Sequence, residues 1–120
     1  MLCKNHRLSD LNLSGNSISN RGWEAFAEAL KVNTSLTTLS LDFNNLQDEG
    51  VEILAEGIRD NTSLKSIDFE GNKIGDVGGR RILAAVKNNR SIVDVTLMPL
   101  NSISAEIQVK IKEILNERQK

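Results

Sequence analysis

The chain is poor in cysteine and histidine and contains no long hydrophobic run. Its 120 residues hold one cysteine, Cys3, so an internal disulfide is impossible and we expect a reducing compartment, the cytoplasm. The one histidine, His6, lies close to the N-terminus, where we expect an incidental role and no general base. No apolar run reaches the roughly 18 residues of a membrane span. The first seven residues lack the apolar core of a secretory signal.

Charge of one sign is also lacking, because the formal net charge is −1. This balance gives no indication of a nucleic acid or membrane partner. The sequence contains no Cys-x-x-Cys motif, no glycine-rich phosphate loop and no metal-ligand spacing. We therefore expect no enzyme activity, no cofactor and no metal.

The sequence does contain a pattern that repeats every 28 residues. It occupies residues 8–18, 36–46 and 64–74, and a fourth copy begins at Ile92. The fourth copy carries one inserted residue within 98–100, after which the pattern resumes at Asn101. Such a period predicts one solenoid domain over 1–120. Its expected repeats are 8–35, 36–63, 64–91 and 92–120.

Each copy divides into a strand, a turn and a helix. Leucine-type residues two positions apart predict a short strand with one apolar face. An asparagine follows, which we expect to bond the backbone of neighbouring loops in a ladder. The ladder residues are Asn16, Asn44, Asn72 and Asn101. We expect helix N-caps at Asn20, Asp48, Asp76 and Ser104, and left-handed C-terminal caps at Asn33, Asn61 and Asn89.

The unit resembles the ribonuclease-inhibitor-like subclass of leucine-rich repeats. The resemblance covers residues 2 to about 117 and rests on the Asn-x-Ile/Leu turn followed by a full helix. It implies an α/β solenoid, a right-handed βα horseshoe arc with a parallel sheet on the concave face and helices on the convex face. Proteins of this subclass include ribonuclease inhibitors, Ran GTPase-activating proteins, NACHT-receptor sensor domains and tropomodulins. Secreted leucine-rich-repeat proteins usually have cysteine-rich caps, which this sequence lacks.

The two ends of the array differ in sequence. Residues 1–7 align with the last turn of a repeat helix, so we interpret them as the remnant of a preceding repeat. The first strand would then have an uncovered edge, which predicts self-association through the N-terminal side. The last helix carries polar residues around its apolar stripe, which is typical of a C-terminal capping repeat.

The outward strand positions carry the one candidate site. Five of these twelve positions are acidic and none is basic, and Phe43 stands where two other repeats have Gly15 and Gly71. The predicted partner-binding residues are Asp10, Asp42, Phe43, Asp68, Glu70 and Asp94. An aromatic side chain beside carboxylates suits a protein partner with a basic segment. The alternative is a solvated acidic face.

The most direct interpretation is a non-catalytic protein–protein interaction module that binds through its concave face. Two alternatives stay open. One is a regulator of an enzyme, similar to a GTPase activator or an inhibitor. The other is a structural C-terminal cap of a longer repeat array.

Overall fold

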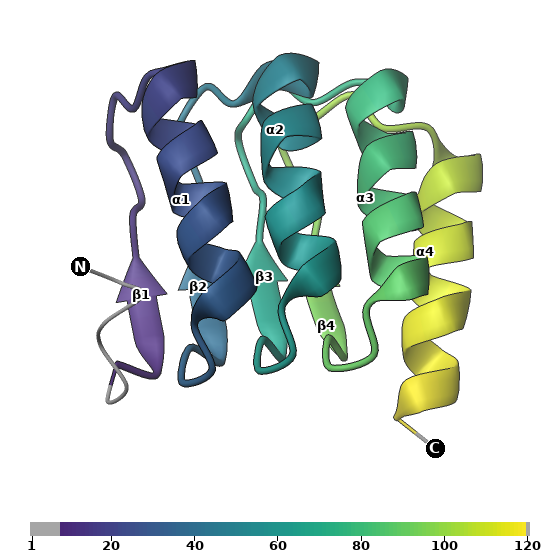
Figure 1. The fold of residues 1–120 in the computed structure, drawn as a ribbon. Helices are drawn as coiled ribbons and strands as arrows, with labels where there is room; N and C mark the ends of the chain where they lie inside the picture. The colour runs from purple at the N-terminus through teal and green to yellow at the C-terminus, as the bar shows by residue number, and fades with distance from the viewer. Residues whose placement is uncertain (1–7, 120) are drawn as a thin grey trace.

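The computed structural model describes residues 8–119, which alternate between short strands and helices (Figure 1). Cys3, His6 and the predicted helix remnant at 1–7 lie outside the described residues. In chain order the elements are β1 (Asp10–Asn12), α1 (Asn20–Val32), β2 (Thr38–Ser40), α2 (Gln47–Asp60), β3 (Ser66–Asp68), α3 (Asp76–Asn88), β4 (Asp94–Thr96) and α4 (Ala105–Arg118). This alternation confirms the predicted α/β solenoid.

The strands form a parallel sheet in the order β1-β2-β3-β4. Leu11 pairs with Leu39, Leu39 pairs with Ile67, and Ile67 pairs with Val95. Each repeat therefore adds one strand in the same register as the last. The helices lie side by side in a second layer that covers one face of the sheet (Figure 1).

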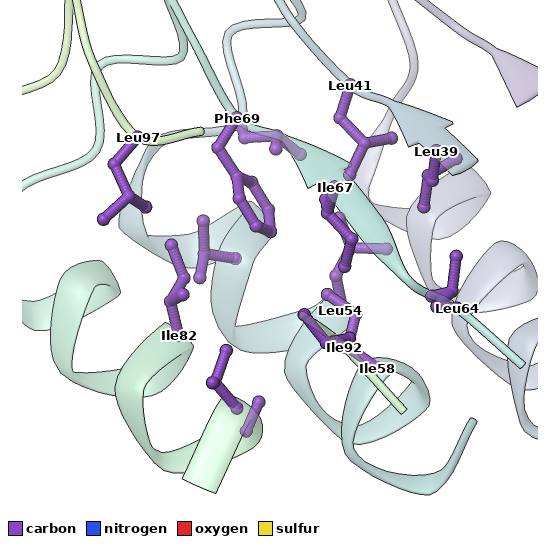
Figure 2. Close-up of a cluster of buried hydrophobic side chains, with 14 of the residues drawn as sticks. Leu39, Leu41, Leu54, Ile58, Leu64, Ile67, Phe69, Ile82, Ile92 and Leu97 are labelled. Atoms are coloured by element: carbon purple, nitrogen blue, oxygen red, sulfur yellow. The ribbon is translucent and has the colours of Figure 1, made fainter. Parts of the chain in front are cut away.

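The core fills the space between the two layers. Figure 2 shows Leu39 and Ile67 of the strands, with Leu41 and Phe69 directly after them, packed with helix residues Leu54, Ile58 and Ile82. All of them are buried. Burying one such side chain contributes about 1.5–3 kcal/mol, so the stacked layers are the main source of stability.

Helices α1 and α2 are in close contact at a position where glycine removes a side chain. A Cβ added at Gly57 of α2 would lie 2.5 Å from the carbonyl oxygen of Ala27 in α1. No larger residue fits there without moving a helix. Gly57 therefore sets the close stacking of the first two repeats.

A ladder of asparagine amides connects the loops that follow the strands. Asn44 Nδ2 donates to the carbonyl oxygens of Leu13 and Leu41, both at 2.9 Å, and its Oδ1 accepts from Asn16 N at 2.9 Å. Asn72 and Asn101 make the equivalent bonds one and two repeats later. Asn16 is exposed, and its amide donates within its own repeat, to Leu13 O at 2.7 Å.

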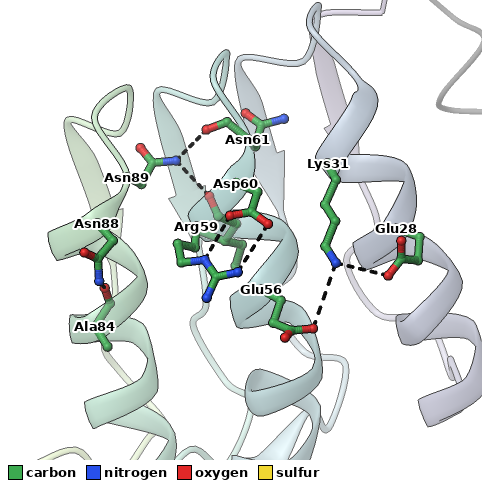
Figure 3. Close-up of polar contacts among 10 residues, drawn as sticks. Glu28, Lys31, Glu56, Arg59, Asp60, Asn61, Ala84, Asn88 and Asn89 are labelled. Atoms are coloured by element: carbon green, nitrogen blue, oxygen red, sulfur yellow. Dashed lines mark hydrogen bonds and ion pairs between the residues drawn. The ribbon is translucent and has the colours of Figure 1, made fainter.

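A second asparagine ladder runs along the other ends of the helices. The prediction of left-handed caps at Asn33, Asn61 and Asn89 was wrong, because all three have extended backbones with φ of −75°, −74° and −91°. Asn61 Nδ2 donates to Leu30 O at 2.8 Å and to Asn33 O at 3.1 Å. Asn89 Nδ2 donates to Ile58 O and Asn61 O, both at 2.7 Å (Figure 3). These buried amides tie each repeat to the one before it.

The predicted N-caps at Asn20, Asp48 and Asp76 were also wrong, because these residues are already inside helices. Their side chains reach the next repeat instead. Asp48 Oδ1 accepts from Gly75 N at 2.7 Å, and Asp76 Oδ1 accepts from Ser104 N at 2.7 Å. The N-cap positions belong to Ser19, Leu46, Gly75 and Ser104. Ser104 is thus at the predicted position, although its side chain makes no capping hydrogen bond.

The C-terminal flank carries its own set of donors. Arg118 Nη2 donates to Val86 O at 2.7 Å and Nη1 donates to Ile92 O at 2.9 Å. Gln119 Nε2 donates to Val93 O at 2.6 Å. In the preceding repeats, Leu30 O and Ile58 O accept from asparagine amides of the next repeat, and Lys65 O accepts from Val93 N. Arg118 and Gln119 therefore take the place of a further repeat's donors.

Candidate partner-binding face

The strand residues that point away from the helices form three rows across the sheet. The pairing aligns Asp10, Thr38, Ser66 and Asp94 in one row and Asn12, Ser40, Asp68 and Thr96 in the next. Ser14, Asp42, Glu70 and Met98 continue the pattern as a third row. Ser14 Oγ donates to Asp42 Oδ2 at 2.9 Å, which places the first two members of the third row side by side.

The carboxylates gather over the middle strands. Asp42, Asp68 and Glu70 are half-buried, whereas Asp10 and Asp94 are exposed. Asp68 Oδ1 accepts from Glu70 N at 2.9 Å, so the backbone of the third row holds the carboxylate of the second. Adjacent strands are about 4.8 Å apart, so Asp42 and Glu70 face each other across one strand spacing.

These carboxylates have no cation beside them within residues 8–119. The ion pairs of that range all lie on helices, at Lys31, Arg59, Arg81 and Lys110. Two unit charges 5 Å apart in water repel by about 0.8 kcal/mol, and by more beside a protein surface. Within residues 8–119, the carboxylates of this face therefore keep their negative charges without a neighbouring cation.

Phe43 lies at the edge of this face with a strained backbone. Its φ is +58°, in the left-handed region, and its side chain is 48% exposed. The repeat imposes this conformation, because Gly15, Gly71 and Leu100 have φ of +71°, +70° and +65°. Glycine adopts it freely, whereas another residue loses about 1–2 kcal/mol. The Phe43 ring lies against Gly71, where an added Cβ would be 2.5 Å from ring atoms Cδ1 and Cε1.

Sequence reasoning missed Leu100, which is 65% exposed. Once the insertion is allowed for, Leu100 occupies the position of Gly15, Phe43 and Gly71, and this alignment was the available signal. Met98, 39% exposed in the third row, was likewise not among the predicted site residues.

The helix face contains a groove of a different character. A groove of about 640 Å³ runs between α1, α2 and α3 and is lined by Glu24, Glu49, Glu52, Ile53, Ala55, Glu56, Arg59, Arg81, Ala84, Ala85 and Asn88. Figure 3 shows this helix surface, where Lys31 bridges Glu28 and Glu56, at 3.1 and 4.0 Å. Arg59 donates to Asp60 at 2.9 Å, and this hydrogen bond lowers the pKa of the Asp60 carboxyl. Acids here are partly neutralised, in contrast to the concave face.

The described part of the chain shows neither a cluster of metal ligands nor a membrane-spanning helix. Residues 8–119 contain no group of three or more His, Cys, Asp or Glu side chains arranged to hold a metal ion. No helix of that range is both long and apolar enough to span a bilayer.

The strand–loop–helix unit, repeated in register, defines a leucine-rich-repeat solenoid. Residues 4–27, 32–55 and 60–83 match the family described as Leucine Rich repeat, and the chain belongs to this family. The ribonuclease-inhibitor-like subclass stays a prediction. No curated protein matches the chain.

Two solved structures share the fold at low sequence identity. The first is "Leiomodin-1 Actin-Binding Site 2 (ABS2)", with a TM-score of 0.77 and 15% identity, covering 98% of this chain and 85% of the other. The second is the tropomodulin C-terminal domain of Caenorhabditis elegans, with a TM-score of 0.63 and 16% identity, covering 96% and 86%.

Proposed function

We propose that this chain is a non-catalytic interaction module that binds a protein partner with a basic segment through its concave strand face. The observation that carries the proposal is the set of carboxylates over β2 and β3. Within residues 8–119 they lie side by side without a cation, whereas five acids on the helices form ion pairs: Glu28, Glu52, Glu56, Asp60 and Glu106. Their mutual repulsion is unfavourable in the free protein and would be relieved by a partner's Lys or Arg.

The test compares two variants with the same change in charge. Asp42→Lys with Asp68→Lys alters the concave face, and Glu24→Lys with Glu113→Lys alters exposed helix positions. Each protein is immobilised and exposed to the same cell lysate at low and high salt. We expect proteins that bind the wild type and the helix variant, but not the concave variant, and that dissociate as salt screens the charges. Equal capture by all three proteins would contradict the proposal.

Actin is the first individual partner to test, because the leiomodin-1 segment that shares this fold is named as an actin-binding site. Cosedimentation of the wild type and both charge variants with filamentous actin gives the answer. Loss of binding in the concave variant alone would identify actin as a partner of this face. If none of the three proteins cosediments, actin is excluded, and the lysate experiment decides whether another partner binds.

A further inference from the structure

Large apolar side chains gather at the edge of the acidic face. We call the three residues Phe43, Met98 and Leu100 the apolar rim; they are 48%, 39% and 65% exposed. The other large exposed hydrophobic residues within 8–119 are Val32, Val77 and Val109, which all lie on helices. The loops between strands and helices therefore present apolar surface at one edge of the concave face.

The backbone holds the rim together across three neighbouring repeats. Phe43 N donates to Glu70 O at 3.0 Å, and Gly71 N donates to Pro99 O at 3.1 Å. These bonds place Phe43, Gly71 and Leu100 in successive loops. The Phe43 ring covers Gly71, and the loop that contains Leu100 accepts hydrogen bonds from Gly71 N and Lys73 N. The Phe43 ring thus fills the space that a side chain at Gly71 would occupy, and it joins the loops of the second and third repeats.

Neither Phe43 nor Leu100 is explained by folding alone. Both have large apolar side chains exposed to water, and both occupy a left-handed position that glycine fills without strain in the first and third repeats. Exposed apolar side chains held in an unfavourable backbone conformation are typical of binding surfaces.

Charge next to the rim indicates what it binds. Asp42 precedes Phe43 directly, and Glu70 O accepts from Phe43 N, so two residues with carboxylates adjoin the rim at Phe43. We propose that the apolar rim receives a large aliphatic or aromatic side chain of an extended partner segment that carries Lys or Arg one or two positions away. This proposal rests on the proposed function and names the partner's recognition element. A guanidinium or ammonium group beside Phe43 would gain cation–π contact as well.

A random twelve-residue peptide display library is the probe, selected against the wild-type chain at low salt. We expect enrichment of segments with a basic residue next to a large apolar one. A chosen peptide should then bind Phe43→Gly with Leu100→Gly about tenfold or more weakly, as loss of a binding hot spot does. Glycine fits both positions, so this variant should resist urea at least as well as the wild type. The matched control is Val109→Ala, an exposed apolar residue on α4, which should bind like the wild type.

The outcomes separate this inference from the proposed function. The selected peptides could carry basic residues without large apolar ones and bind the glycine variant as tightly as the wild type. That result would overturn the inference about the apolar rim, but not the proposed binding by the acidic face. Apolar peptides insensitive to Asp42→Lys with Asp68→Lys would overturn the inference as stated. A library that yields no peptide sensitive to either variant would count against both.

Discussion

Equivalent residues of the first and second repeats lie in different surroundings. Leu11 and Leu13 are half-buried, whereas Leu39 and Leu41 are completely buried, at 0% exposure. Asn16 is exposed, and its counterpart Asn44 is 4% exposed. The residues are the same, so their own hydrophobicity does not set the difference. A leucine-rich repeat obtains its core from its neighbours on both sides, and its contribution to stability depends on its place in the array.

The largest expected effect on the free energy of unfolding comes from a leucine-to-alanine substitution, compared at the two paired positions Leu11 and Leu39. Leu39→Ala should lower the free energy of unfolding by about 2–5 kcal/mol, because it leaves a cavity between the layers. Leu11→Ala should cost clearly less, since its side chain is only half-buried. Urea denaturation of both variants measures this. Equal losses would show that the first repeat is covered as well as the second.

The ladder asparagines allow the same comparison for polar groups. Asn44→Ala should cost about 1–3 kcal/mol, because it leaves buried backbone groups of Leu13, Leu41 and Asn16 without partners. Asn16→Ala should cost a fraction of that, since water reaches its site. A change at Asn44 of only a few tenths of a kcal/mol in urea melts would show that the ladder contributes little.

At the opposite flank, the donors from Arg118 and Gln119 should protect the last repeat. Arg118→Ala removes two hydrogen bonds to half-buried carbonyl oxygens and should cost about 1–3 kcal/mol. Arg118→Lys should recover only part of this, because an ammonium group cannot reproduce the guanidinium fork. Hydrogen exchange in α4 should rise more than in α2. Uniform exchange along the chain would contradict a local role for Arg118.

The smallest effect concerns an exposed pair at the end of α2. The hydrogen bond from Arg59 lowers the pKa of the Asp60 carboxyl in the folded state. The stability that this hydrogen bond adds is therefore fully present above the carboxyl's unfolded-state pKa. It is lost as pH falls through the lower folded-state pKa. Asp60→Asn should therefore be slightly less stable than the wild type near neutral pH and equal to it well below about pH 4. Both side chains are over two-fifths exposed, so the difference should be small. Urea melts across this pH range would contradict it if the difference were constant.

The sequence predicted the strands and the position of the helices because these depend on local spacing. Leucines two residues apart predict a strand whatever surrounds them. Because side chains alternate between the two faces of a strand, the same spacing also predicted that Asp42, Asp68 and Glu70 point away from the helices. The capping predictions were wrong where a side chain forms hydrogen bonds with another repeat. Asp48 and Asn61 were assigned local capping roles, but in the structure they bond the following and the preceding repeat.

The candidate site was predicted incompletely for a similar reason. Phe43 was recognised because it replaces a glycine without any insertion nearby. Leu100 occupies the same structural position, but the inserted residue at 98–100 shifted it out of simple alignment. The backbone, with φ of +65° at Leu100 and +58° at Phe43, confirms that the two residues are equivalent.

The partner is proposed to bind to the concave face and not to the helix face. A photo-crosslinking amino acid placed at Ser40, on β2 in the middle of the face, tests it against the same amino acid at Ala84, exposed on α3. In a cell lysate at low salt, we expect a discrete crosslinked partner at Ser40 that disappears at high salt, and none at Ala84. A partner crosslinked at Ala84 and absent at Ser40 would show that binding occurs on the helix face.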